Sequence, residues 1–250
     1  MPEICIIVPC YNEGKRLDVK AFIEFTVKNQ FVSFLFVNDG SIDSTWPIID
    51  SISNNENIFG LNLSKNMGKS EAVRQGLLHA KNNFKVNWLG YWDADLATPL
   101  NEIILMYNQV RNEGEIDLII ASRIKRLGAK VERKVTRHVL GRIFSTFASI
   151  ILKLPIYDSQ CGAKLIKFDL INILFDKVFI SRWLFDIEII ARYRNLVGLK
   201  KALISVKEHP VNVWEEKGDS RIKISYLLKV PFELLQIHIE YNYPSQKVLS

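Results

Sequence analysis

Short apolar runs alternate with longer amphipathic stretches through the first half of the chain. Runs of four to six residues end at polar or turn-forming side chains, as buried strands do, and the segments between them repeat apolar residues at helical spacing. The pattern predicts strands at Ile4–Val8, Phe34–Val37, Ile58–Leu63, Val86–Tyr91 and Leu118–Ala121. It predicts helices at Leu17–Asn29, Ser44–Ser53, Lys69–Asn82 and Leu100–Glu113.

This alternation is typical of an α/β fold, in which helices cover both faces of a mostly parallel sheet and ligands bind beyond the carboxyl ends of the strands. At 250 residues the chain has the length of one large α/β domain or two small ones. We expect a single domain over residues 1–250, divided into a first part, 1–122, and a second part, 123–250.

Polar side chains follow the first two predicted strands. Pro9 is expected to end the first strand, and Tyr11 and Glu13 then project an aromatic face and a carboxylate towards the crevice. Asp39 stands at the tip of the second strand, where it could accept a hydrogen bond from a nucleobase. Asp43 is placed to N-cap the next helix.

The third and fourth strands lead into residues suited to phosphate and metal. Gly68 allows close backbone approach, and Lys69 adds positive charge at a helix N-terminus. Asp93 and Asp95 are two residues apart at a strand end, so both carboxylates point into one crevice. Such a pair suits Mg²⁺ or Mn²⁺ that clamps a nucleotide diphosphate. The alternative is a loop aspartate that caps the helix starting near Pro99.

A basic stretch opens the second half. Residues 123–142 contain eight arginines and lysines and one acid, Glu132, so this stretch attracts phosphates, unless it is only a solvated helix face. The apolar segment His138–Leu154 that follows is too short and too charged to span a bilayer; it fits an interfacial helix or a buried core helix equally well. Near the C-terminus, Ile224–Ile239 carries one helical apolar stripe (Leu227, Val230, Leu234 and Ile237).

The remaining composition points to the cytoplasm. Three cysteines (Cys5, Cys10 and Cys161) are odd in number and have no metal-binding spacing, which predicts reduced thiols. The opening residues show no signal-peptide pattern. We therefore expect a cytoplasmic protein, soluble or peripheral on the inner face of the membrane.

The combined motifs resemble a known family. VPCYNE at 8–13, VNDGSIDST at 37–45, NMGK at 66–69 and DADLATP at 93–99 look like the nucleotide-sugar domain of family 2 glycosyltransferases, which have the Rossmann-like GT-A fold. The resemblance implies a UDP-sugar donor and a bound divalent metal. It implies that Pro9, Tyr11 and Glu13 line the nucleoside pocket, Asp39 meets the uracil, Asp93 the ribose and diphosphate, and Asp95 the metal.

The second half narrows the acceptor. DSQCGAKLI at 158–166, RWLFDIEII at 182–190 and VWEEKGDSRI at 213–222 look like polyprenyl-phosphate sugar transferases, most closely the dolichyl-phosphate β-glucosyltransferase type. Arg123, Arg133 and Arg137 fall where that family places arginines against the acceptor phosphate, and guanidinium groups suit phosphate chemically. One departure is Ala97, because related mannosyl enzymes have a glutamine metal ligand there.

These features predict an inverting hexosyltransferase that uses a UDP-sugar, with glucose favoured, and a polyprenyl phosphate at a membrane surface. If the acceptor were a sugar hydroxyl, a carboxylate base would be needed, and Asp158 and Asp186 are the candidates, although each could instead be a helix cap or an ion-pair partner of Arg182 or Lys164. The first rival is a glycosyltransferase that extends a cell-surface oligosaccharide. The second, a nucleic-acid-binding protein, is disfavoured because the basic stretch has no aromatic residue before Phe144.

Overall fold

The computed structural model describes residues 2–132, 135–217 and 229–242. The first half runs β1 (Ile4–Cys10), α1 (Val19–Lys28), β2 (Val32–Asp39), α2 (Thr45–Ile52), β3 (Ile58–Leu63), α3 (Lys69–Asn83), β4 (Trp88–Trp92), α4 (Asn101–Asn112) and β5 (Leu118–Ser122). The second half runs β6 (Lys130–Glu132), α5 (Val135–Leu152), β7 (Ala163–Lys167), the 3-10 turn η1 (Phe168–Leu170), α6 (Ile171–Phe175), α7 (Phe185–Val197), α8 (Leu199–Ser205), β8 (Val206–Pro210), β9 (Val213–Glu215) and α10 (Val230–Asn242).

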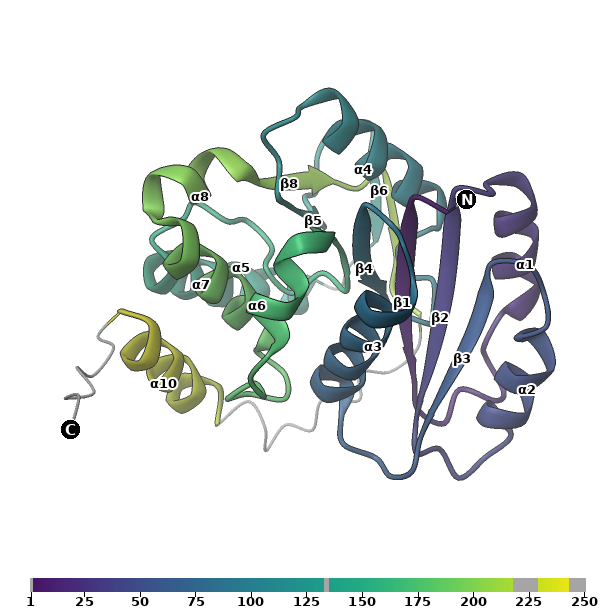
Figure 1. Cartoon of the computed structure of the whole chain (residues 1–250). Coiled ribbons are helices and arrows are strands. Elements are labelled where there is room, and N and C mark those ends of the chain that lie inside the picture. The colour runs from purple at the N-terminus through teal and green to yellow at the C-terminus, as the bar shows by residue number, and fades with distance from the viewer. Residues whose placement is uncertain (1, 133–134, 218–228, 243–250) are drawn as a thin grey trace.

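The centre of the molecule is a mixed sheet with the strand order β3-β2-β1-β4-β7-β5-β8 (Figure 1). The pairs β3–β2, β2–β1, β1–β4 and β5–β8 are parallel, whereas β7 is antiparallel to both β4 and β5. Because β7 runs the other way, the residues that enter it lie at the same edge as the carboxyl ends of β4 and β5. That edge therefore collects loops from both halves of the chain.

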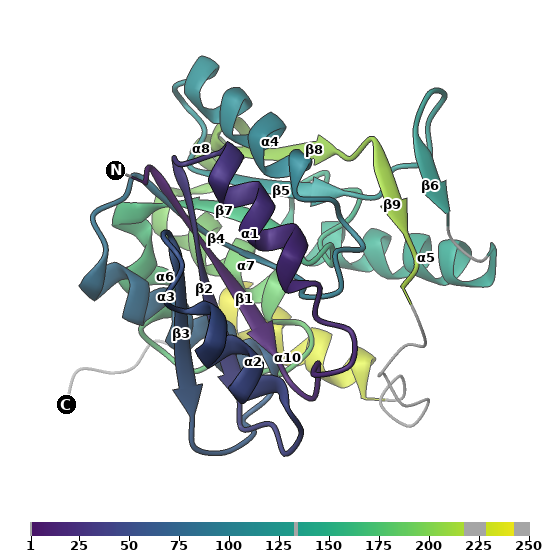
Figure 2. The same cartoon turned by 90° about the vertical axis from the view of Figure 1, so that its right-hand side faces the viewer.

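Side-chain alternation along the buried strands builds a core on each face of the sheet. In β1, Ile4 and Ile6 contact one hydrophobic cluster, while Cys5 and Ile7 contact the other. Helices α1, α2 and α4 cover the first face, and α3, α6 and α7 cover the second (Figure 2). Both faces of the strands are thus buried, which explains their nearly continuous apolar sequences.

The predicted strands and helices of the first half are confirmed, with ends that differ by at most two residues. Strands β7 and β8 and the small β6–β9 sheet were not predicted. In β7 the apolar run is interrupted by Lys164, which is fully buried, so the sequence of this strand lacks the uniform apolar pattern of β1 or β2. Its pairing with β4 depends on contacts across more than seventy residues of chain.

Two local predictions need correction. Pro9 does not end β1, which continues to Cys10 with Pro9 paired opposite Val37. The ladder to β4 already stops at Ile7, so a residue without an N–H is tolerated there. The N-cap of α2 is Ser44 rather than Asp43, although the Asp43 carboxylate does accept from the N–H of Thr45 at 3.0 Å in the first turn.

The two segments left open by the sequence form helices with one buried face each. On α5, Ala148 and Leu152 are buried while the opposite face is exposed, so α5 is not a fully buried core helix, and its place at a membrane interface stays a prediction. On α10, Leu234 and Ile237 are buried as predicted. Leu227 lies outside the described residues, and among those described no helix combines the length and hydropathy required to cross a bilayer.

Candidate active site

A cavity of about 440 Å³ opens where β1, β2 and β4 end. Strand β1 lies between β2 and β4, and the loops that leave these three strands meet at the carboxyl edge of the sheet, where α/β folds bind ligands. The cavity is lined by Pro9, Cys10, Tyr11, Glu13, Arg16, Asp39, Asn66, Gly68, Lys69, Ala72, Asp93, Ala94, Asp95, Arg182 and Trp183. Every residue that the sequence placed around the donor nucleotide is in this set.

Asp39 connects β2 to the start of α3. It is buried, and its two carboxylate oxygens accept from the backbone N–H groups of Met67 and Gly68, each at 2.8 Å. Burial raises the pKa of Asp39, and the two N–H groups oppose this shift. Gly68 has a φ of 93°, a conformation that other residues rarely adopt. Asp39 therefore fixes the turn from which α3 begins.

Asp93 and Asp95 stand together at the end of β4. The N–H of Asp93 donates to the carbonyl of Gly162 at 3.0 Å, and its carboxylate forms an ion pair with Lys69. Asp95 accepts from the N–H of Ala97 at 3.0 Å. Burial raises the pKa of Asp95, and the negative charge of Asp93 raises it further. The charge of Asp93 thus disfavours the ionised form of Asp95.

This donor set fits a hard divalent cation, which would relieve that repulsion. Within residues 2–132, 135–217 and 229–242, no three or more His, Cys, Asp or Glu side chains converge as a complete metal site. Asp93 and Asp95 would therefore supply only part of the coordination shell, and a substrate or water would supply the rest. Ala97 adds no oxygen ligand from its side chain.

Basic groups balance these acids. Burial lowers the pKa of Lys69, but the negative charges of Asp93 and Asp186 outweigh the effect of burial, so the pKa of Lys69 is raised overall. Arg16 pairs with Glu13, with Nη2 at 2.9 Å from Oε1. The cavity therefore contains a mixed set of charges, with cations placed next to the carboxylates.

The sequence reasoning missed Arg182 and Trp183. They precede α7 and reach the cavity from the second half of the chain. In the sequence, Arg182 opens the motif RWLFDIEII and is a possible ion-pair partner of a candidate base, and neither feature predicts a place at the donor site. The positive charge of Arg182 lowers the pKa of Asp39, but burial raises that pKa by more. An Arg-Trp pair just before an amphipathic helix was the available signal.

Asp158, one candidate base, is joined to Arg123, one candidate acceptor residue. Nε and Nη2 of Arg123 donate to the two oxygens of Asp158 at 2.6 and 2.8 Å, and the Arg123 backbone N–H donates to it at 3.0 Å. Both side chains are largely buried, and the guanidinium carbon lies 5.4 Å from the ring centre of Trp214. Burial opposes the charge of Arg123, but Asp158 raises its pKa overall.

Asp186, the other candidate base, belongs to a buried network. Tyr91 and Lys164 both donate to its Oδ1, and Lys164 also donates to the carbonyl of Cys161 at 2.8 Å. The Lys164 side chain is completely buried. Burial raises the pKa of Tyr91, and the charge of Asp186 adds to the shift. Asp158 and Asp186 are thus each held in an ion pair.

The other two acceptor arginines cannot be placed in the site. Arg133 lies outside the described residues, and Arg137 lies in α5, where only its backbone is described. Their arrangement around a phosphate stays a prediction.

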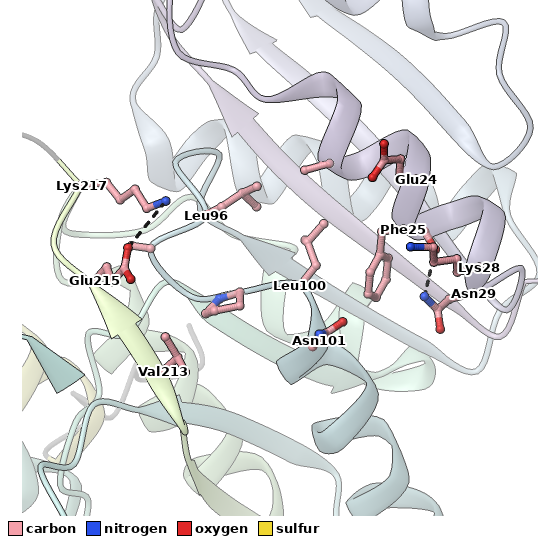
Figure 3. Close-up of a pocket in the computed structure, with 13 residues that line it drawn as sticks. Glu24, Phe25, Lys28, Asn29, Leu96, Leu100, Asn101, Val213, Glu215 and Lys217 are labelled. Atoms are coloured by element: carbon pink, nitrogen blue, oxygen red, sulfur yellow. Dashed lines mark hydrogen bonds and ion pairs between the residues drawn. The ribbon is translucent and has the colours of Figure 1, made fainter. Parts of the chain in front are cut away.

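A second cavity, of about 410 Å³, lies behind the loop that carries Asp95 (Figure 3). It is bounded by α1, by residues 96–101 and by β9 with the residues after it. Leu96, the residue after Asp95, lines it and has a φ of 54°. The charged groups on its rim include Glu215 and Lys217, which are 4.0 Å apart. It holds no arrangement of side chains that indicates chemistry.

Comparison with known proteins identifies the class. The family model "Glycosyl transferase family 2" matches residues 5–175. A dolichyl-phosphate beta-glucosyltransferase of Trichomonas vaginalis is 33% identical over 96% of this chain and 74% of its own length. One from Dictyostelium discoideum is 27% identical over 95% of this chain and 74% of its own.

Among solved structures, glucosyl-3-phosphoglycerate synthase from Mycobacterium tuberculosis, in complex with Mn²⁺, UDP and phosphoglyceric acid, superposes with a TM-score of 0.68 at 15% identity, over 96% of this chain and 78% of that one. The protein therefore has the GT-A fold and is a glycosyltransferase of family 2. Within that family it is similar to the dolichyl-phosphate β-glucosyltransferases.

Proposed function

We propose that the protein transfers glucose, with inversion, from UDP-glucose to a polyprenyl phosphate at the inner face of a membrane, with Mg²⁺ or Mn²⁺ bound at Asp93 and Asp95. The observation that carries the proposal is the convergence of Asp39, Lys69, Asp93 and Asp95 around one cavity at the carboxyl edge of the sheet. The names of the relatives support the acceptor class and the sugar, and the UDP complex of the solved neighbour supports the donor.

The donor nucleotide would lie between β1 and α3. Each oxygen of Asp39 accepts one backbone N–H and keeps further acceptor capacity, which suits the N–H of a uracil ring. The diphosphate would lie near the N-terminus of α3, where backbone N–H groups and Lys69 favour negative charge. Asp93 and Asp95 would hold the metal, which would supply positive charge beside the diphosphate. Lys69 provides a second positive charge at the same place.

A phosphate acceptor removes the need for a strong base. The second pKa of a phosphate monoester is about 6, so at neutral pH most of the acceptor is already ionised. This agrees with the geometry of Asp158 and Asp186, both of which are committed to ion pairs. We therefore assign Asp158 to holding Arg123, and Asp186 to holding Lys164 and, through it, the loop before β7. We expect a base role for either aspartate only if the acceptor is a sugar hydroxyl.

The test is a transfer assay with the purified protein. Incubation with radiolabelled UDP-glucose, polyprenyl phosphate and Mg²⁺ or Mn²⁺ should move label into the organic phase, and EDTA should stop it. GDP-mannose and UDP-N-acetylglucosamine serve as competing donors. Asp95→Ala should abolish metal-dependent transfer while leaving the unfolding temperature close to that of the native protein, because Asp95 lies in a loop and not in the core.

Full activity of that variant with Mg²⁺ would remove the metal assignment. If label instead enters an added oligosaccharide and not the lipid, the protein extends a glycan, which is the second candidate function. Asp158 and Asp186 would then return as candidate bases.

A further inference from the structure

Residues 176–184 connect α6 to α7 and form part of the wall of the 440 Å³ cavity, called the donor cavity below. This wall segment contains no helix or strand, so its backbone must find partners in neighbouring side chains. It carries Arg182 and Trp183 into the donor cavity. A Cβ atom built at Gly68 would lie 3.6 Å from Cδ of Arg182, so the stem of Arg182 reaches the start of α3. The course of the wall segment therefore sets where a positive charge and an aromatic ring stand.

Ser181 shapes the wall segment just before α7. It is buried, and its hydroxyl accepts from the backbone N–H groups of Trp183 and Leu184 at 3.1 and 2.8 Å. The same hydroxyl donates to the carboxylate of Glu233, which lies in the first turn of α10. A serine hydroxyl donates one bond and accepts two, and an ionised carboxylate can only accept. Glu233 therefore turns the hydroxyl so that its lone pairs face the two N–H groups.

A second connection starts from the last turn of α10. Glu188 is completely buried, and its Oε2 accepts from the backbone N–H of Ile180 at 2.8 Å. Its Oε1 accepts from the hydroxyl of Tyr241 at 2.7 Å and from Nη2 of Arg192 at 2.8 Å. Tyr241 belongs to α10, so both ends of this helix are linked by hydrogen bonds to the wall segment.

Helix α10 is fixed to the body of the protein independently of these links. It packs against α5 and α7, and its buried Leu234 and Ile237 belong to one of the two hydrophobic clusters (Figure 1). Arg194 of α7 donates to the carbonyl of Tyr241 at 2.9 Å. The described residues that line the donor cavity include none from α10. The helix can therefore act on a bound donor only through the wall segment.

The negative charge of the donor cavity makes the position of Arg182 important. The diphosphate of a donor would add charge of the same sign as the four carboxylates that line the cavity (Glu13, Asp39, Asp93 and Asp95). Arg182 lowers the pKa of Asp39, so its positive charge acts inside the cavity. A displacement of Arg182 would leave more of the repulsion between the carboxylates and a diphosphate uncompensated.

We propose that α10 sets the donor affinity by positioning the wall segment, with Glu233 and Tyr241 as positioning residues for Arg182 and Trp183. The inference rests on the proposed function in one respect, because the affected ligand is the UDP part of the donor. Glu233 acts through Ser181, and Tyr241 acts through Glu188.

The first measurement needs no ligand. Deuterium exchange of the amides in 180–184 is followed by mass spectrometry in the intact chain and in Glu233→Ala, Glu233→Gln and Tyr241→Phe. Glu240→Ala is the matched control, because it removes an exposed carboxylate from the same helix. We expect exchange in 180–184 to be about tenfold faster in Glu233→Ala and Tyr241→Phe, since each loosens a local opening equilibrium. Glu233→Gln should resemble the native chain, because its amide oxygen can still accept from Ser181.

The second measurement is a double-mutant cycle on UDP affinity by calorimetry. Glu233→Ala is made in the native chain and in the variant Arg182→Ala/Trp183→Ala, which keeps the backbone N–H groups that Ser181 binds. We expect Glu233→Ala to weaken UDP binding about fivefold in the native chain and less than about twofold in the variant, because the side chains through which it acts are then absent. Urea titrations confirm that every variant is folded at the temperature of the assay.

Unchanged exchange in Glu233→Ala would overturn the proposal, and so would an equal loss of UDP affinity in both backgrounds. A lower free energy of unfolding with unchanged UDP affinity would also overturn it, since α10 would then only stabilise the fold. If the cycle shows the expected coupling but no glucose reaches polyprenyl phosphate, the positioning role stands and only the proposed function is rejected.

Discussion

Replacing Gly162 by alanine tests whether the loop before β7 positions Asp93. A Cβ atom built at Gly162 lies 2.0 Å from Oδ2 and 2.3 Å from Cγ of Asp93, whereas ordinary contacts begin near 3.4 Å. The carboxylate would have to move by roughly 1.4 Å, the difference between the contact limit and the observed gap. Its ion pair with Lys69 would be lost or rearranged.

The expected loss is functional more than structural. Overpacking in a core costs about 1–3 kcal/mol, but the Asp93 side chain is 39% exposed and can swing into the cavity, which places the cost at the lower end. A misplacement of about 1 Å in a reacting site can reduce the rate about 100-fold. We therefore expect Gly162→Ala to lose about two orders of magnitude in kcat/KM for glucose transfer, with a loss of Mn²⁺-dependent UDP affinity.

Calorimetric titration with UDP, with and without Mn²⁺, is the direct assay, because it does not depend on knowing the acceptor. Gly114→Ala is the control, since nothing lies within 4 Å of a Cβ at that position. If Gly162→Ala keeps its Mn²⁺-dependent UDP affinity within twofold of the control, the loop does not set the position of Asp93 and the reasoning fails.

Three further changes have expected outcomes. Asp39→Asn should weaken UDP binding at least tenfold by calorimetry, because a hydrogen bond to a charged group contributes about 1.5–3 kcal/mol. The amide also leaves one backbone N–H at the start of α3 without an acceptor. Unchanged UDP affinity would contradict the assignment of Asp39 to the uracil. Lys164→Met should lower the free energy of unfolding in urea by about 3–5 kcal/mol, because it leaves the buried carboxylate of Asp186 without its ion-pair partner, and a much smaller loss would contradict this account. Burial raises the pKa of Cys5 from 9.0 to about 12, so its contribution to stability is complete below pH 9 and is lost as the pH rises towards 12. At pH 10 the loss from this thiol is about 1.4 kcal/mol, which urea titrations of the native protein and Cys5→Ala should reveal as a difference in slope against pH.

The first half of the fold was predictable because its strands are local and uniformly apolar. Ile4–Cys10 and Val32–Asp39 are buried on both faces. Such strands can be predicted from their own apolar sequences, without knowing which segments pack against them. Strand β7 is different, because Lys164 lies in its middle and acquires its partner, Asp186, only when α7 has packed. From the sequence alone, a lysine in a short apolar run is interpreted as a surface residue, because its buried partner is not known.

The candidate site likewise contains residues that the sequence pattern can place and residues that it cannot. Asp39, Asp93 and Lys69 follow strands in order, so their convergence follows from the parallel topology alone. Arg182 and Trp183 reach the cavity from a loop between two helices, and no rule of strand order places them there. Their position depends on how α7 packs against the sheet, which the sequence pattern does not encode locally.

The charge balance around Arg123 bears on where an acceptor phosphate can bind. Its guanidinium is held by both oxygens of Asp158, so the pair carries almost no net charge, and the Asp158 backbone N–H is in turn held by Glu208 at 2.8 Å. A neutral, buried pair is a poor attractor for a dianion, although the remaining N–H groups of Arg123 can still orient one. The attraction for an acceptor phosphate must then come from cations other than Arg123. From Lys125 to Arg142 the sequence has seven basic residues and one acid, Glu132, so the excess positive charge lies on this segment. Phosphate affinity would accordingly depend on this segment.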